Sequence, residues 1–547
     1  MKLEFCAELS PKLFSEIGTP TDGFINEDGK YLALCSEFPL LFWPGRAMYE
    51  GHRLKHRVSL YERDNLKLVR VFDAAKYQIN DLAFHPSKPL IAIATGSYDG
   101  GYHFEGEIIL WNWQSGETTS LLGESREILG CRFLGENQLA IIMHPPDEGD
   151  FESNAFCTFF GLILNDFCSA LQAGYLLDAE NQNSSCKTYD ARLVDLKPID
   201  PADFGFSEDE LLSENGQKRF FEALGDSVKW EERGRIWDVC WISDNQIAAV
   251  HEKCYLEVWN RHGERELFEA GQGFGIQLLN HPKGIVVNVF QPPKFQTNTT
   301  EGSPGKSSLV IYDGNSSTVV RSFDHAYVFS VDRFGNILCR DPGDFLRLNR
   351  VRNDLLLNYE FQTVQTLDLG YYDCFNSYIR LDGSDELYYL SGTPPESHEN
   401  KQLFRIDVNG SIEKVMNWDK SDLHLLNGIA CLDSENSIIR AFRVHYYDPN
   451  NLEVRIERNC LISNRVFWSC VVTSLVTSMS LIEDKILVFT LTDGKIGLIN
   501  TLEGKIVFEE ELKINGISTM ALSTSVNGLD IAIGAIDGRI LVFKLVK

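Results

Sequence analysis

Residues 78–122 read QINDLAFHPSKPLIAIATGSYDGGYHFEGEIILWNWQSGETTSLL, and this is the most informative stretch of the chain. It divides into four short β-rich runs, separated by the turn residues Pro86-Ser87-Lys88, Asp99-Gly100 and Gly116-Glu117. Apolar runs of this length with short-period alternation favour strands over helices. The stretch therefore predicts one four-stranded antiparallel meander.

The same layout recurs three more times, at residues 236–269, 478–510 and 517–545. The last two copies carry Asp-Gly between their second and third strands, where a tight hairpin needs a positive backbone angle. Looser packets with the same strand rhythm lie at residues 23–74, 128–165, 274–323, 327–363, 372–417 and 428–470. The chain thus holds about ten units of about 35 to 50 residues, the length of a four-stranded propeller blade.

These units predict an all-β protein, a β-propeller of four-stranded antiparallel blades. Familiar rings hold roughly four to eight blades, so ten units imply one enlarged ring or two fused rings. A single ordinary core is excluded by length, because 547 residues exceed the roughly 250 at which cores usually split.

The residues of the clearest unit resemble a WD40 repeat. Asp99 matches the turn aspartate of that family, Ser97 a preceding position at a strand end, and Trp111-Asn112 the terminal Trp-Asp pair. The resemblance implies that these residues stabilise the repeat. WD40 propellers are generally interaction platforms, so it also implies a role in binding other proteins.

Other repeats match the family at single positions. Asp493 and Asp537 match the turn aspartate, and Trp259 matches the tryptophan. The chain departs from the pattern because neither tryptophan precedes Asp, and no Gly-His dipeptide precedes a repeat. The hydrogen-bond network typical of the family is therefore expected to be incomplete.

Three further segments organise the chain. The lone strand at residues 2–9 is expected to complete the last blade, 517–545, which stops after its third strand and would otherwise expose an edge. Residues 166–234 interrupt the blades, and Ser207 followed by acidic residues has the signature of a helix start, so a partly helical insertion is predicted. Residues 291–308, rich in Pro, Thr, Gly and Ser, predict a flexible loop.

Charge and composition exclude several classes of protein. With 51 basic and 78 acidic residues, the formal charge is 51 − 78 = −27, which repels nucleic-acid phosphates and anionic lipid surfaces. The start of the chain has no signal-peptide pattern, and no apolar run is long enough to cross a bilayer. Thirteen cysteines without a Cys-x-x-Cys pair fit a reducing compartment, and we expect a cytoplasmic protein.

No motif predicts a catalytic centre, a metal site or a cofactor. Residues 302–307, GSPGKS, imitate a phosphate-binding loop, but Thr300 stands where the motif needs Gly, and a strand follows. The segment His251–Cys254 is the closest approach to a zinc cluster, and its place between two strands favours a surface turn. The acids Glu4, Asp81 and Asp238, near first strands, could face a central channel, but capped and solvated carboxylates are the more frequent explanation for such residues.

Two features could contact a partner. Tyr102, His103 and Phe104 lie on an enlarged loop, where aromatic residues are favoured interface anchors, although packing over the neighbouring blade explains them equally well. The acidic groups 147–152, 207–214 and 509–511 are solvated or face a basic partner.

The sequence as a whole predicts a non-catalytic scaffold or regulatory subunit that recruits proteins through propeller loops and the 166–234 insertion. The alternative is a propeller-type hydrolase or lyase with a site at the channel mouth, acting with or without a metal ion.

Overall fold

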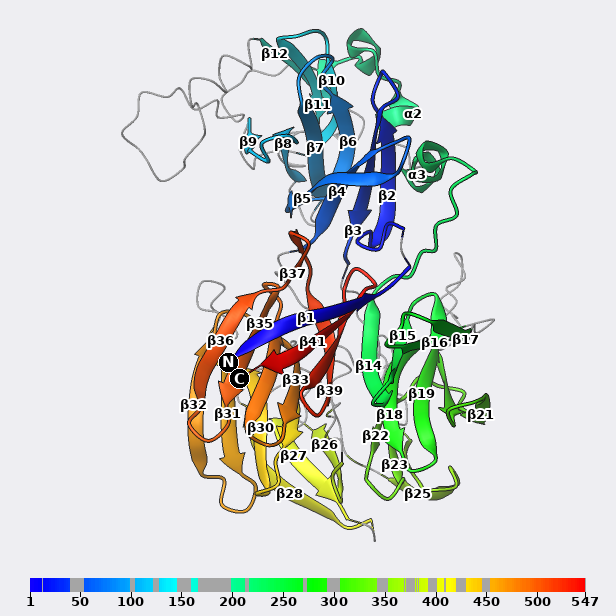
Figure 1. Cartoon of the computed structure of the whole chain (residues 1–547), viewed down its shortest axis with the longest axis vertical. Helices are drawn as coiled ribbons and strands as arrows, with labels where there is room; N and C mark the ends of the chain where they lie inside the picture. The colour runs from blue at the N-terminus through cyan, green and yellow to red at the C-terminus, as the bar shows by residue number, and fades with distance from the viewer. Residues whose placement is uncertain are drawn as a thin grey trace. The chain divides into compact units, whose positions relative to one another are not determined.

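Strands dominate the structure, a computed structural model, and nearly all of them belong to four-stranded antiparallel sheets (Figure 1). The described residues form nine four-stranded sheets, one three-stranded sheet and one two-stranded sheet. The prediction of an all-β fold built from four-stranded antiparallel sheets is therefore confirmed. The structure describes residues 1–11, 13–39, 54–98, 104–121, 127–144, 159–165, 198–211, 216–268, 273–292, 305–341, 353–367, 369, 379, 381, 383–391, 401–407, 410–419, 429–444 and 453–546.

The chain divides into a smaller unit, residues 19–39 and 53–230, and a larger unit that includes residues 1–18 and 231–547. Three sheets make up the described part of the smaller unit, and their strands follow the chain in order. The first contains β2 (Thr19–Ile25), β3 (Tyr31–Glu37), β4 (His56–Glu62) and β5 (Lys67–Ala75); the second β6 (Ile79–Phe84), β7 (Leu90–Tyr98), β8 (Phe104–Asn112) and β9 (Thr118–Ser120); the third β10 (Ile128–Phe133), β11 (Gln138–Met143), β12 (Phe159–Asn165) and β13 (Pro198–Ile199).

Helical segments after β13 pack against β2 and β10, each of which is the first strand of a sheet in the smaller unit. They are η3 (Pro201–Phe204), α2 (Glu208–Leu211) and α3 (Gly216–Leu224). At the start of α2, Ser207 Oγ accepts the Glu210 amide at 3.2 Å, and Glu210 Oε2 accepts the Ser207 amide at 2.8 Å, which is a capping box. The side chains of Phe206 and Leu211 pack against Gly130 of β10, whereas α3 packs against β2.

Seven further sheets make up the described part of the larger unit, besides a two-stranded pair, β37 (Lys513–Ile514) and β38 (Ile517–Ser518). The first four contain β14 (Ile236–Ser243), β15 (Gln246–His251), β16 (Cys254–Asn260) and β17 (Arg265–Phe268); β18 (Phe274–His281), β19 (Gly284–Gln291), β20 (Lys306–Tyr312) and β21 (Ser317–Ser322); β22 (Val328–Val331), β23 (Ile337–Arg340), β24 (Asp354–Leu357) and β25 (Thr363–Leu367); and the three strands β26 (Leu387–Ser391), β27 (Lys401–Ile406) and β28 (Ile412–Asp419).

The remaining three sheets follow in the same order. They contain β29 (Ala430–Leu432), β30 (Ser437–Arg443), β31 (Val454–Cys460) and β32 (Val466–Val472); β33 (Val476–Ile482), β34 (Ile486–Leu491), β35 (Lys495–Asn500) and β36 (Lys505–Glu511); and β39 (Ala521–Asn527), β40 (Asp530–Ala535), β41 (Ile540–Val546) and β1 (Lys2–Leu9).

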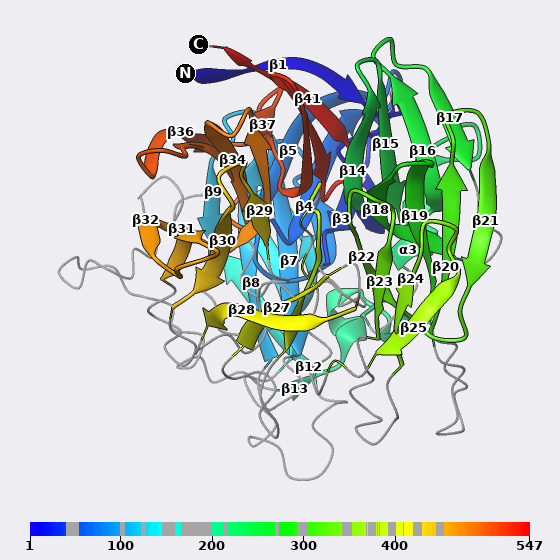
Figure 2. The ribbon, with the colours of Figure 1, turned by 90° about the horizontal axis from the view of Figure 1, so that it is seen from below.

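The N-terminal strand β1 pairs antiparallel with β41, so residues from the two ends of the chain share one sheet (Figures 1 and 2). The register places Lys2 opposite Val546 and Leu9 opposite Ile540, with one irregularity between Phe5 and Ala7. Because β1 lies along the outer edge of β41, it covers a strand edge that would otherwise be open to other chains.

Apolar side chains join each sheet of the larger unit to its neighbour. Five separate buried clusters join six successive sheets in pairs. These sheets begin with β18, β22, β26, β29, β33 and β39, and one cluster lies between each sheet and the next. Another cluster, which includes Ile236, Trp241 and Ile540, joins the last sheet to the one that begins with β14. The strands β14 and β15 in turn lie against β18.

Polar side chains make a second set of links between neighbouring sheets. In seven sheets the pairing of the first two strands shifts register, and the residue after the shift is Asp22, Asp81, Gly130, Asp238, Gln277, Ser478 or Ser523. Five of these side chains accept a hydrogen bond from a backbone amide in the first strand of the following sheet, at 2.8–3.3 Å. The other two residues of the seven, Asp22 and Gly130, contact the helical segments instead.

Two of these residues correct the sequence analysis. Asp81 and Asp238 are not solvated carboxylates: Asp81 accepts the Cys131 amide at 2.9 Å, and Asp238 is 2% exposed and accepts the Leu278 amide at 2.8 Å. A carboxylate can fill such a place because several N–H donors replace the water that it loses.

Two predicted segments extend beyond the described residues. Of the 166–234 insertion, residues 166–197 and 212–215 lie outside them, and the described remainder contains β13, η3, α2 and α3. Most of the 291–308 loop, residues 293–304, also lies outside them. Within the described part of the chain, no helix has the length and apolar character needed to span a membrane.

Candidate functional site

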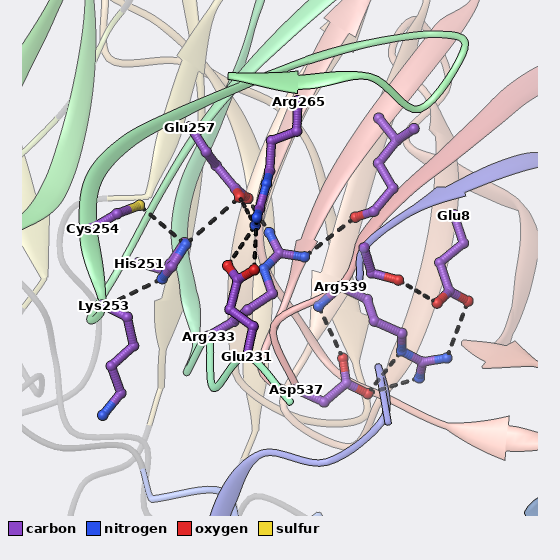
Figure 3. Close-up of polar contacts among 12 residues, drawn as sticks. Glu8, Glu231, Arg233, His251, Lys253, Cys254, Glu257, Arg265, Asp537 and Arg539 are labelled. Carbon is purple, nitrogen blue, oxygen red and sulfur yellow. Dashed lines mark hydrogen bonds and ion pairs between the residues drawn. The ribbon is translucent and has the colours of Figure 1, made fainter. Parts of the chain in front are cut away.

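A largely buried group of side chains, most of them charged, lies in the larger unit where five chain segments meet (Figure 3). The segments are residues 231–235 ahead of β14, the hairpin of β15 and β16, the start of β17, the end of β1, and the turn between β40 and β41. We call this group the Glu257 cluster; its labelled members are Glu8, Glu231, Arg233, His251, Lys253, Cys254, Glu257, Arg265, Asp537 and Arg539.

Glu257 is the centre of the cluster and is 0% exposed. One of its carboxylate oxygens pairs with the guanidinium group of Arg233, and the other lies 3.8 Å from Arg265 Nη1. Burial alone would raise the pKa of Glu257, but the charge of Arg233 and the nearby His251 outweigh it and lower the pKa to about 2. The carboxylate is therefore a fixed anion at any physiological pH.

His251 and Cys254 flank this anion within the hairpin. The Sγ atom of Cys254 lies 3.0 Å from His251 Nε2, and Glu257 Oε2 lies 3.7 Å from the same nitrogen. The other ring nitrogen, Nδ1, accepts the Lys253 amide at 3.2 Å, so the proton of the neutral ring is on Nε2. Both His251 and Cys254 are 1% exposed, which corrects the interpretation of 251–254 as a surface turn, since only its tip reaches solvent.

The second half of the cluster fixes the end of β1. Arg539 is 1% exposed, donates to Asp537 Oδ2 at 2.7 Å and approaches Glu8 Oε2 to 3.7 Å (Figure 3). Ser10 Oγ donates to the other oxygen of Glu8 at 2.7 Å, and Arg233 reaches the Leu9 carbonyl at 3.4 Å. These contacts hold the N-terminal strand where it leaves the last sheet.

Trp259 provides the apolar surface on which two cations of the cluster rest. The guanidinium carbons of Arg233 and Arg265 lie 5.6 and 5.4 Å from the centroid of its ring, within the range of a cation–π contact. Arg265 also makes two hydrogen bonds to Glu231, at 2.5 and 2.6 Å. Trp259, which the sequence assigned to the repeat, is thus a packing residue that orients charge.

The trio of Cys254, His251 and Glu257 contains the residue types of a nucleophilic relay but not its geometry. In such a relay the nucleophile and the acid contact different ring nitrogens, whereas here both face Nε2. Burial and the charge of Glu257 also raise the pKa of the Cys254 thiol above its ordinary value, which favours the thiol over the nucleophilic thiolate. This arrangement locks a hairpin and cannot transfer a proton from thiol to acid.

The described part of the cluster also lacks the grouping of ligands that a metal ion needs. Among the residues that the structure describes, no group of three or more His, Cys, Asp or Glu side chains is placed to hold a metal ion. The carboxylates of the Glu257 cluster are instead neutralised by arginine side chains.

The residues matched to the WD40 pattern are described except for Asp99, which lies outside the described residues. Ser97 lies in β7, and Trp111 lies in β8, where it is 1% exposed and contacts Phe72 of the preceding sheet at 5.8 Å between ring centroids. Asp493 and Asp537 each precede a glycine with a positive φ, of 83° at Gly494 and 87° at Gly538. The expected positive backbone angle at both Asp-Gly turns is confirmed.

The two turn aspartates bind local partners. Asp493 accepts Thr473 Oγ1 at 2.7 Å and pairs with Lys495 at 3.3 Å, while Asp537 pairs with Arg539. An arginine or lysine two positions later therefore neutralises each aspartate.

The aromatic loop is described only in part. Asp99, Tyr102 and His103 lie outside the described residues. Phe104 is 4% exposed and packs against His144, which directly follows β11 of the third sheet, with 4.9 Å between ring centroids. We therefore assign to Phe104 a packing role between neighbouring sheets.

Sequence reasoning missed the Glu257 cluster. The signal that could have revealed it is a charged residue within an apolar strand: Glu257 lies at the fourth position of CYLEVWN, and two arginines, Arg233 and Arg235, precede β14. A glutamate at such a position needs a cationic partner.

Comparisons with known proteins do not assign the chain to a family. No family model and no curated protein matches the chain. Among the solved structures that match it are virginiamycin B lyase from Staphylococcus aureus, with 12% identity, a TM-score of 0.41 and coverage of 57% of this chain and 96% of that one, and the computationally designed Ika8 protein, with 11% identity, a TM-score of 0.39 and the same coverage.

Proposed function

We propose that this chain is a non-catalytic scaffold of WD40-like type, which recruits partner proteins through the loops of its propeller sheets and the 166–234 insertion. In this proposal the seven sheets of the larger unit form one closed ring, and the three sheets of the smaller unit are a separate body capped by its own helices. In place of the one enlarged ring or two fused rings expected from the sequence, the chain then has one closed ring and one partial ring.

Closure of the larger ring is supported by Asp238, the observation that carries the structural part of the proposal. Its carboxylate accepts the Ser523 hydroxyl from the last sheet at 2.7 Å and the Leu278 amide from the second sheet at 2.8 Å. An apolar cluster that contains Ile236 and Ala532 joins the same last and first sheets. The sheets thus contact one another at the join as they do elsewhere.

A role without catalysis is supported by how the buried ionisable groups are used. Glu257, Arg233, Asp537 and Arg539 neutralise one another, and the geometry around His251 does not fit a nucleophilic relay. Rigid strands held in this way can present loops and outer edges whose side chains are free to vary. Recruitment needs such a rigid frame and no chemistry.

The alternative, a propeller-type hydrolase or lyase, is favoured by one observation in the smaller unit. Burial raises the pKa of Asp81 to about 6 and that of Glu127 to about 7. Carboxyl groups with raised pKa values are common at catalytic sites, although structural burial produces the same shift. If the purified chain shows hydrolase or lyase activity, and Glu127→Gln loses that activity while it still folds, the enzyme is favoured over the scaffold.

The insertion provides the direct test of the scaffold. In a variant whose residues 166–197 are replaced by a short Gly/Ser linker between β12 and β13, we expect the near-ultraviolet spectrum and thermal midpoint to stay close to those of the full chain. Partner proteins that co-purify with the full chain should be lost. If the variant retains every partner at full stoichiometry, the insertion is not the contact surface.

A further inference from the structure

The smaller unit contains a carboxyl group that is partly buried without a cation beside it. Glu127 immediately precedes β10, and the stem of its side chain lies on Gly96 of β7, where a Cβ atom would collide with it. Among the residues that the structure describes, its carboxyl group accepts a single hydrogen bond, a long one of 3.5 Å from Asn80 Nδ2. A bond of this length is weak, so the carboxyl group has little to replace the water that it loses.

Carboxylates that are buried elsewhere in the chain are neutralised. Those of Glu257, Asp354, Glu457 and Asp537 each pair with an arginine side chain that is also buried. Glu127 differs, because no charged side chain of the described residues acts on its pKa. A carboxylate that is partly buried without a counter-charge lowers the stability of the free protein. A cationic ligand would supply the missing charge.

His144 lies directly opposite Glu127 and also lacks a partner. The His144 amide donates to the Glu127 carbonyl at 3.0 Å, which continues the β10–β11 ladder one step beyond the Ile128–Met143 pair. Directly opposed residues of an antiparallel pair project to the same face, with Cβ atoms about 4.5 to 5.5 Å apart. His144 is 7% exposed, and its Nδ1 atom is buried without a hydrogen-bond partner among the described residues. Two side chains that need partners are therefore neighbours.

Aromatic rings hold the imidazole of His144 in place. Its centroid lies 4.9 Å from that of Phe104 and 6.2 Å from that of Phe159. Burial lowers the pKa of His144 to about 4, so the ring is neutral at physiological pH. With its proton on Nε2, a neutral ring presents Nδ1 as an acceptor. When Glu127 is ionised, the pair thus offers two acceptors and one negative charge.

We infer that Glu127 and His144 form a binding site for a primary ammonium group, in which the carboxylate supplies the counter-charge and His144 Nδ1 accepts one N–H. An ammonium group is compact and carries three donors on one atom, so it can contact acceptors on two residues. A guanidinium group instead favours both oxygens of one carboxylate, and a quaternary ammonium group has no N–H for His144.

Lysine side chains and free amines share this chemistry. If the ammonium group belongs to a lysine of a partner protein, the inference rests on the proposed scaffold function and names one residue type that the scaffold binds. If it belongs to a free amine, the site is a small-molecule site on the same protein.

Binding should depend on pH in a way that a purely structural role would not produce. The pKa of Glu127 is about 7 because of burial; Asp81 on β6 and Glu105 and Glu107 on β8 are not among the groups that shift it, and His144 is neutral. The ammonium group binds the ionised carboxylate, so affinity should be nearly constant above about pH 8 and fall about tenfold from there to about pH 6. Below pH 7, binding should release a proton.

The test uses n-butylammonium chloride as the probe for the full-length chain, in titration calorimetry between pH 6 and pH 8.5. We expect one site per chain, a Kd that rises about tenfold from pH 8 to pH 6, and a heat that depends on the ionisation enthalpy of the buffer. Tetramethylammonium chloride at the same ionic strength is the matched control. It should bind about tenfold or more weakly, because it has no N–H donor.

Two variants test the two residues separately. His144→Phe keeps an aromatic ring against Phe104 and Phe159 but removes Nδ1, whereas Glu127→Gln removes the charge. Each should weaken binding of the probe about tenfold or more, and the control Glu105→Gln, at an exposed position of β8, should not. The residual binding of His144→Phe should keep its pH dependence, and that of Glu127→Gln should lose it. Equal near-ultraviolet spectra would show that all three variants fold.

A native chain that does not bind n-butylammonium, or a Glu127→Gln variant that binds it equally well, overturns this inference. Mass spectrometry of the small molecules that the native chain and Glu127→Gln retain identifies the source of the ammonium group. An amine retained by the native chain alone is a free ligand; a native chain that binds the probe but retains no amine assigns the site to a lysine of a partner. The scaffold is tested separately by replacing residues 166–197, so failure of the site and failure of the scaffold are distinguishable.

Discussion

The Ser523 hydroxyl donates a 2.7 Å hydrogen bond to the Asp238 carboxylate, across 285 positions of sequence. The other oxygen of Asp238 accepts the Leu278 amide, so one side chain contacts the first strands of three successive sheets, β39, β14 and β18. A bond between the last and first sheets of the larger unit is what closure of a ring requires.

Replacement of Asp238 by alanine should lower the free energy of unfolding by about 3 kcal/mol, because it leaves the buried Leu278 amide and the Ser523 hydroxyl without their acceptor. Asp324→Ala, which removes a side chain that is 96% exposed, is the matched control and should change little. Chemical denaturation followed by tryptophan fluorescence measures both. Equal stability of the two variants would contradict the role of Asp238 in joining the sheets.

Glu257→Gln should cost about 3 kcal/mol or more at pH 7, since it leaves Arg233 buried without its counter-charge. The pKa of Glu257 in the folded protein, about 2, lies below the ordinary value near 4.5. Its stabilisation is therefore present above pH 4.5 and is lost as the pH falls from there to about 2.

Unfolding measured across that pH range should show this acid-dependent loss in the native protein and a flatter profile in Glu257→Gln. The control is Glu503→Gln, at an exposed turn position. A native-like slope in Glu257→Gln would mean that another carboxylate causes the acid sensitivity.

For Glu127 we predict a pH dependence of stability that is opposite to that of Glu257. Burial raises its pKa to about 7, so its contribution to stability is full below pH 4.5 and is lost as the pH rises through 7. Glu127→Gln should therefore stabilise the smaller unit at pH 8, by about 2 kcal/mol after allowance for partial solvent screening, and should have little effect at pH 4.5. Glu105→Gln, at an exposed position of β8, controls for the loss of one negative charge. A destabilised Glu127→Gln at pH 8 would refute this assignment.

Two accessible cysteines should differ in reactivity. Hydrogen bonds from the Ser463 side chain and from the amides of Ser463 and Ile462 lower the pKa of Cys460, whereas burial and the charge of Asp530 raise the pKa of Cys6. Because the thiolate is the nucleophile, iodoacetamide at pH 8 should alkylate Cys460 before Cys6, although Cys6 is the more exposed. Peptide mass spectrometry over time measures both rates, and Ser463→Ala should slow Cys460. Faster labelling of Cys6 would show that exposure outweighs the pKa difference.

The strands were predictable because their pattern is local. The meander at residues 78–122 corresponds to β6–β9, and that at 236–269 corresponds to β14–β17. In each, apolar alternation and turn residues act within a few positions of one another. Trp111 and Trp259, which were matched to the repeat pattern, are both buried, because they lie within such locally patterned strands.

The polar links were not predictable because they depend on residues that are distant in sequence. The sequence around Asp238 does not indicate that Ser523 donates to it. The sequence of the hairpin 251–254 likewise does not indicate that Arg233 neutralises the nearby Glu257. From the sequence alone, a carboxylate on a strand is equally compatible with a solvated and a buried position, because its partners are not known.

The central claim, recruitment of proteins without catalysis, is tested most directly by affinity purification of the tagged full-length protein from its native host at moderate salt, with mass spectrometry of both the retained proteins and the retained small molecules. We expect a partner protein in fixed stoichiometry that is lost when residues 166–197 are replaced. A chain that purifies alone while carrying a metal ion or a metabolite would contradict the scaffold and support the enzyme.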